Sequence, residues 1–68
     1  MRMLDKNRLK AKIVERGTNI EEVSKKIGID KATFYRKMGN NSFLVKEVDA
    51  ITKELSLTKE EATSIFFA

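Results

Sequence analysis

The chain has 68 residues, and a domain of this size buries only about 60% of the surface that its unfolded chain exposes, so we expect a single domain. It contains neither cysteine nor histidine. This excludes disulfides and thiolate metal sites, and it removes the usual general base and the commonest metal ligand. We therefore predict that the protein is not an enzyme and that it holds no metal and no cofactor.

The formal net charge is +4, and the charge is distributed unevenly along the chain. Residues 1–39 contain eleven Lys or Arg and five Asp or Glu, whereas residues 40–68 contain three basic and five acidic residues. A basic segment followed by a mildly acidic one is typical of a polyanion-binding surface beside a supporting region. A lysine-rich solvated surface explains the same distribution, and charge alone does not separate the two interpretations.

The apolar runs of the chain are short. Residues 43–45 and 65–67 are examples, and both fall far below the roughly 20 apolar residues that span a bilayer. The chain begins with charged residues such as Arg2 and Lys6 and lacks the apolar stretch of a signal peptide. We therefore expect a cytoplasmic protein that does not bind membranes.

The first predicted helix covers residues 5–16. Its opening aspartate is a good N-cap residue, and Leu4 and Leu9 stand where a hydrophobic staple places its two apolar residues. Leu9 and Ile13 then share one face of the helix. Gly17 follows the helix, and glycine readily adopts the left-handed conformation that ends one.

A second helix is predicted over residues 20–27. Two capping boxes are possible at its start, Thr18 with Glu21 or Asn19 with Glu22, and the spacing does not choose between them. The apolar residues of this helix repeat at helical spacing, so they form its inner stripe: Ile20, Val23 and Ile27.

A third helix is predicted over residues 31–38. Asp30 precedes it as the cap residue, and its carboxylate is expected to satisfy the free amides of the first turn. Phe34 and Met38 are four positions apart, so both face inward. Gly39 is expected to end this helix.

A fourth helix is predicted from about residue 45 to residue 55, with Ser42 or Leu44 as its cap and Phe43 tucked under the bundle. Its apolar stripe has three-to-four spacing: Val45, Val48, Ile51 and Leu55.

Thr58 and Glu61 form a capping box that opens a fifth helix, with its apolar residues on one side: Ala62, Ile65 and Phe66. No segment alternates apolar and polar residues as a strand does. The predicted fold class is therefore an all-α bundle of about five short helices.

The segment between residues 20 and 38 is the most informative, because two short helices joined by a three-residue turn must cross steeply. The small Ser24 allows a close approach of the second helix, Gly28 turns the chain, and Ile29 fills the corner. This arrangement leaves four residues on the outer face of the third helix: Lys31, Ala32, Tyr35 and Arg36.

The run from residue 19 to residue 39, NIEEVSKKIGIDKATFYRKMG, resembles the Cro and phage-repressor (XRE-type) helix-turn-helix family. The resemblance implies a lambda-repressor-like domain over residues 1–68, with the helix-turn-helix unit at about 19–38 and the recognition helix, 31–38, in the major groove of DNA. It implies four base-contacting residues: Lys31, Ala32, Tyr35 and Arg36. It also implies six phosphate-contacting residues: Asn19, Thr33, Lys37, Asn40, Asn41 and Lys46.

The chain departs from the family pattern at three positions. The family usually has glutamine at position 20, alanine at position 24 and an aliphatic residue at position 37, where this chain has Ile20, Ser24 and Lys37. We expect Met38 to take over the packing that an apolar residue at position 37 would provide.

The resemblance implies a sequence-specific double-stranded DNA-binding regulator, a repressor or Cro-like protein of a phage or prophage, with no small-molecule ligand. Such a protein is expected to bind its operator as a homodimer, at least on DNA, with half-sites about 34 Å apart. Phe66 and Phe67 are adjacent, and adjacent helical side chains point about 100° apart. One of them is therefore expected to pack inward and the other to contact a partner, such as the second subunit. The alternative function is a protein-interaction module, an antirepressor or adaptor, that docks through its C-terminal helix.

Overall fold

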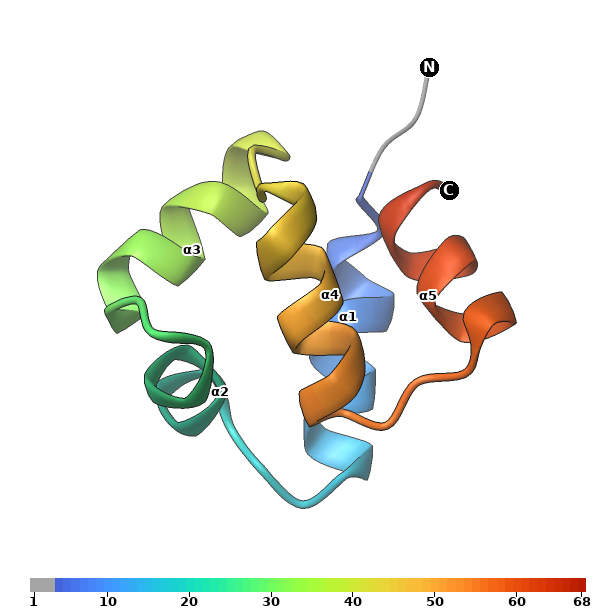
Figure 1. Cartoon of the computed structure of the whole chain (residues 1–68), viewed down its shortest axis with the longest axis horizontal. Coiled ribbons are helices and arrows are strands. Elements are labelled where there is room, and N and C mark those ends of the chain that lie inside the picture. Colours follow the sequence, from blue (N-terminus) through green and yellow to red (C-terminus); the bar gives the residue numbers. More distant parts are fainter. Residues whose placement is uncertain (1–3) are drawn as a thin grey trace.

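Residues 4–68, which the computed structural model describes, form five α-helices with no β-strand among them (Figure 1). The helices are α1 (Lys6–Glu15), α2 (Ile20–Ile27), α3 (Lys31–Asn40), α4 (Val45–Glu54) and α5 (Lys59–Phe66). The predicted all-α class is confirmed, and each predicted helix is present. None of the helices in residues 4–68 is long and apolar enough to cross a membrane.

Helix α2 packs closely on two neighbours, and the first helix packs on the last. The closely packed pairs are α2 with α4, α2 with α3, and α1 with α5. Figure 1 shows α4 in front of α1 at the centre, with α2 and α3 on one side and α5 on the other. The two helices expected to form the helix-turn-helix unit therefore lie together, on the side of the bundle opposite α5.

Side-chain caps define the starts of three helices. The Arg8 N–H donates to Asp5 Oδ1 at 3.1 Å, which confirms the cap of α1. The Glu22 N–H donates to Asn19 Oδ1 at 2.9 Å, so Asn19 is the cap of α2. At α5 the predicted capping box is complete, with both reciprocal bonds between residues 58 and 61 present. These caps satisfy amides that a first helical turn leaves free.

The turn between α2 and α3 follows the predicted chemistry. Gly28 has φ +85°, a left-handed conformation that residues with a Cβ rarely adopt, and its N–H donates to the Lys25 carbonyl. Ser24 is fully buried, and its hydroxyl donates to the Ile20 carbonyl at 2.6 Å. The small side chain therefore enters the core with its one donor satisfied.

The core contains side chains from all five helices and from the segments that flank them: Leu4, Leu9, Ile13, Val23, Phe34, Met38, Ile51, Leu55, Leu57, Ile65 and Phe66. Phe43 lies between two of these rings, with its centroid 5.1 Å from that of Phe34 and 6.4 Å from that of Phe66, both in edge-to-face geometry. The predicted position of Phe43 under the bundle is confirmed, and so is the burial of Met38.

Two expectations about α3 are wrong. Gly39 lies inside this helix, which continues to Asn40 and ends at Asn41, a residue with φ +55°. Asparagine tolerates the left-handed conformation better than most residues, so it replaces glycine as the terminator. Asp30 occupies the N-cap position, but its side chain makes no cap hydrogen bond.

The stripe predicted for α4 is also partly wrong, because Val45 is 83% exposed. Ile51 lies six positions later, and at about 100° per residue the two side chains point about 120° apart around the helix. The buried face of α4 instead includes Glu47, which is 5% exposed. Leu44, one of the two predicted cap residues, stands at the N-cap of this helix.

Candidate nucleic-acid interface

One face of α3 is open to solvent. Phe34 and Met38 anchor the helix in the core, and Ala32 and Arg36 lie on the side away from them. All four residues predicted to contact bases are exposed: Lys31, Ala32, Tyr35 and Arg36. These positions are spaced i, i+1, i+4 and i+5, so they form one ridge. The Tyr35 side chain is 47% exposed, which leaves part of its ring and its surroundings accessible.

The charge of α3 distinguishes it from the other four described helices, since it is the only one of them without Asp or Glu. Within residues 4–68, Lys31 and Arg36 form no ion pair. On α1, by contrast, Lys12 pairs with Glu15 and Glu61. The cations on the outer ridge of α3 are therefore not neutralised by the protein itself.

Polar residues lie beside this ridge, near Tyr35, and at the C-terminal end of α3. Asn19 is exposed beside the start of α2, where its Oδ1 caps the helix and its Nδ2 is left as a donor. Asn40 and Asn41 are exposed at the end of α3, and the Ser42 hydroxyl donates to Asn40 Oδ1. Lys46 is exposed in the first turn of α4. These predicted phosphate-contacting residues therefore lie at the surface; Thr33, another of them, is half-buried.

Lys37 is placed differently from the other predicted phosphate contacts. Its Nζ donates to both carboxylate oxygens of Glu47, at 2.8 and 2.7 Å, and the two side chains are only 14% and 6% exposed. The Leu44 N–H donates to the same carboxylate at 2.8 Å. The ammonium of Lys37 is thus occupied inside the bundle, and we leave this residue out of the candidate interface.

The electrostatics of Glu47 reflect two opposing effects. Burial raises the pKa of its carboxyl, but the hydrogen bonds from Lys37 and from the Leu44 N–H outweigh burial and hold the pKa below its ordinary value. The carboxylate is therefore ionised at neutral pH. Sequence reasoning missed this residue, although a glutamate three positions after the N-cap is the usual site of a reciprocal capping bond.

A shallow hollow adjoins the ridge where α1, α2 and α3 meet. Its lining combines apolar and polar side chains: Lys10, Ile13, Val14, Thr18, Asn19, Ile20 and Tyr35. Val14, which sequence reasoning did not single out, is largely exposed there. Tyr35 belongs both to this hollow and to the outer ridge of α3.

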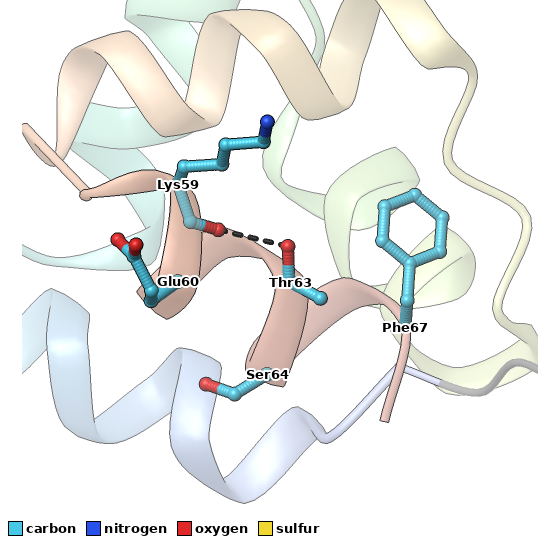
Figure 2. A pocket seen from close by; sticks show the side chains of 5 residues that line it. All are labelled: Lys59, Glu60, Thr63, Ser64 and Phe67. Atoms are coloured by element: carbon cyan, nitrogen blue, oxygen red, sulfur yellow. Dashed lines mark hydrogen bonds between the residues drawn. The ribbon is translucent and has the colours of Figure 1, made fainter.

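The outer face of α5 carries a second hollow, lined by Lys59, Glu60, Thr63, Ser64 and Phe67 (Figure 2). The Thr63 hydroxyl donates back to the Lys59 carbonyl at 2.8 Å, so this polar side chain is satisfied within the helix. Phe67 is 49% exposed, whereas Phe66 is buried. The expectation that one of the two rings packs inward is confirmed, and Phe67 is the one at the surface.

No family model matches the sequence, and neither a curated protein nor a solved structure matches the chain. The resemblance to the Cro and phage-repressor family therefore stays a prediction. Among residues 4–68, no three acidic side chains lie close enough together to hold a metal ion.

Proposed function

We propose that the chain is a sequence-specific double-stranded DNA-binding regulator, a repressor or Cro-like protein of a phage or prophage, with α3 as its recognition helix. One observation carries the proposal. Lys31 and Arg36 lie on an exposed ridge of a helix without acidic residues, and no other group in residues 4–68 neutralises them. Duplex DNA supplies the missing negative charge in a regular array.

The dimensions of the ridge suit the major groove. An α-helix with its side chains is about 10–12 Å across, and the major groove of B-DNA is about 12 Å wide. In this proposal the guanidinium of Arg36 donates two hydrogen bonds to guanine O6 and N7. Lys31 reads an acceptor on a neighbouring base, Ala32 packs on a thymine methyl group, and Tyr35 donates from the edge of the ridge.

Phosphate contacts around the ridge fix its register on the duplex. They come from Asn19, beside Tyr35, and from three residues near the C-terminal end of α3: Asn40, Asn41 and Lys46. Such contacts carry no sequence information, but they make affinity depend on salt, because each neutralised phosphate releases condensed counterions. The protein is then expected to act in the cytoplasm, where bacterial DNA lies.

The proposal includes a homodimer on DNA, with Phe67 in the contact between subunits. A ring that is about half exposed next to a buried one gives α5 an apolar surface that a second copy could cover. Sedimentation at increasing concentration, in the absence and presence of duplex, tests this part. A Phe67→Ser protein that dimerises on DNA as well as the parent would show that the subunits meet elsewhere.

Selection from random duplexes with the purified protein tests the DNA-binding proposal. We expect an enriched sequence, an affinity that falls steeply between low and moderate salt, and loss of the sequence preference in Arg36→Ala. Arg8 is a matched control, because it is an exposed arginine on α1 whose one ion-pair partner within residues 4–68 is Asp5. Arg8→Ala should keep the preference, and an Arg36→Ala protein that also keeps it would contradict the assignment of the recognition helix.

The exposed Phe67 also favours a second candidate function, a protein-interaction module that docks through α5 as an antirepressor or adaptor. Selection from random duplexes and the salt dependence of binding distinguish this candidate function from the DNA-binding regulator. An interaction module would show weak binding to every duplex sequence, no enriched site and no effect of Arg36→Ala.

A further inference from the structure

The link between α3 and α4 depends on few contacts. Both helices pack closely on α2, but α3 and α4 are not among the closely packed pairs of this bundle. They are joined by the loop of residues 41–44 and by the ion pair between Lys37 of α3 and Glu47 of α4. Phe34 and Met38 anchor α3 in the core that it shares with α4, and the loop and the ion pair add the direct connection between the C-terminal half of α3 and α4.

Three elements meet at the ion pair. The Glu47 carboxylate accepts two bonds from the Lys37 ammonium and one from the Leu44 N–H, which opens α4. The Lys37 carbonyl in turn accepts from the Ser42 N–H at 3.0 Å. These two side chains thus bond α3, the loop and α4 to one another at a single place.

Stability does not require charge at this position. Two apolar side chains of similar volume, packed well, commonly stabilise a fold as much as a buried ion pair does. A charged pair differs because its hydrogen bonds are directional, and breaking one of them leaves a buried charge without a partner. The pair therefore favours one arrangement of the loop over others that apolar packing would tolerate.

The residues next to this pair are those of the candidate interface. Arg36 immediately precedes Lys37, and Asn40 lies three positions after it, at the end of the same helix. We propose that the Lys37–Glu47 pair is a positioning clamp, which holds the loop and the C-terminal half of α3 so that Arg36 and Asn40 meet the duplex in one fixed geometry. This inference rests on the proposed function.

A double variant, Lys37→Met/Glu47→Leu, tests the clamp, because it replaces the ion pair with apolar side chains. The Lys12–Glu61 pair between α1 and α5 offers a matched control, Lys12→Met/Glu61→Leu, because Glu61 also accepts from a lysine and from the N–H of an N-cap residue. Each double change removes one positive and one negative charge, so the net charge of +4 is kept. Any difference in duplex affinity between them is therefore not due to net charge.

We expect both double variants to fold. In Lys37→Met/Glu47→Leu the amide of Ser42, whose backbone bond to the Lys37 carbonyl the substitutions leave in place, should exchange with solvent faster than in the parent, while the core amides of α1 and α2 stay protected. Its affinity for the selected duplex should fall about tenfold, since groups in one bonded network are commonly coupled by about that factor. The control should keep both the amide rates and the affinity of the parent.

Glu47→Gln is the second variant, and it separates the clamp from a direct contact of Lys37 with phosphate. The amide of glutamine still accepts from the Leu44 N–H but cannot hold the ammonium as a carboxylate does, so Lys37 is released. A direct contact predicts equal or tighter binding to the duplex, whereas the clamp predicts weaker binding. Glu47→Gln also tests the clamp if Lys37→Met/Glu47→Leu does not fold.

Two results would overturn the clamp: an amide exchange rate at Ser42 equal to that of the parent, or a faster rate with parental affinity for the duplex. Failure of the proposed function is recognised separately, because the parent would then bind no duplex at low salt. The amide rates need no DNA, so in that case they still decide whether the pair holds the loop.

Discussion

The first turns of α4 and α5 have the same arrangement of cap hydrogen bond and ion pair, in different surroundings. In each helix a glutamate three positions after the N-cap accepts from the N–H of the cap residue and from a lysine of another helix. On the α3–α4 side of the bundle these are Glu47 and Lys37, whose side chains are 6% and 14% exposed. On the α1–α5 side they are Glu61 and Lys12, at 29% and 21%.

The difference in exposure gives the two pairs different consequences. Water and salt screen an exposed pair, so its loss costs little, whereas a buried charge that loses its partner has neither water nor a counter-charge. The neighbouring cations also differ. Glu61 has a second cation nearby, because Arg16 Nη2 lies 3.8 Å from its Oε1. Glu47 pairs with Lys37 alone within the described residues. Lys12 and Arg16 on the α1–α5 side therefore have an acidic partner in Glu61, whereas Lys31 and Arg36 on α3 have none within residues 4–68.

The largest effect is expected from breaking the buried pair at one partner. Glu47→Leu should lower the free energy of unfolding by about 3–5 kcal/mol, because it leaves the Lys37 ammonium nearly buried and unpaired. Urea denaturation of Glu47→Leu and of Glu61→Leu measures the contrast, and Glu61→Leu should cost less. Equal losses in the two variants would show that exposure does not distinguish the pairs.

A smaller effect, on the salt dependence of duplex binding, is expected from replacing one of two lysines that occupy equivalent positions on the α3–α4 and α1–α5 sides. Lys31 and Lys59 are each the first residue of their helix, and both are exposed, so Lys31→Ala and Lys59→Ala change helix propensity and net charge alike. If α3 faces the duplex, Lys31→Ala should reduce the slope of log affinity against log salt by about one. Lys59→Ala should leave the slope unchanged.

Titrating duplex binding of both variants over a range of salt concentrations measures these slopes. Equal slopes would mean that the protein attracts DNA through its net charge alone. A reduced slope in Lys59→Ala but not in Lys31→Ala would place the duplex against α5 instead of α3.

Local sequence signals predicted most of the fold. The apolar spacing and the capping residues located all five helices, and α2 has the same bounds in the prediction and in the structure. The errors came from residues whose behaviour depends on distant partners. Val45 was assigned to the buried stripe of α4 from its three-to-four spacing, and no local pattern shows that Lys37, ten positions before Glu47, neutralises that buried carboxylate.

The candidate site was predictable to a similar extent. The exposure of Ala32 and Arg36 on α3 followed from helical geometry once Phe34 and Met38 were placed in the core. Lys37 was grouped with the phosphate contacts because the resemblance to the helix-turn-helix family implied it. Its pairing with Glu47 depends on the path of the loop, which ends α3 at Asn41 instead of Gly39.

The smallest expected effect is a change of stability in acid, and it concerns the more exposed pair, Lys12 with Glu61. Hydrogen bonds from Lys12 and from the Thr58 N–H lower the pKa of Glu61 from 4.5 to about 2. Since the pKa is lower in the folded state, the pair stabilises the fold fully above about pH 4.5, and this contribution is lost as the pH falls from there toward 2. Glu61→Gln lacks the charge at every pH, so its stability should approach that of the parent as the pH is lowered.

Urea midpoints of the parent and of Glu61→Gln, at about pH 6 and about pH 3, test this expectation. The difference between the two proteins should be present at the higher pH and should narrow at the lower one. Glu47 also has a lowered pKa and titrates in both proteins, so its contribution cancels in the difference. A difference that stays constant with pH would mean that Glu61 acts through its cap hydrogen bond to Thr58, which glutamine keeps, or through packing, and that its charge contributes nothing at this exposed site.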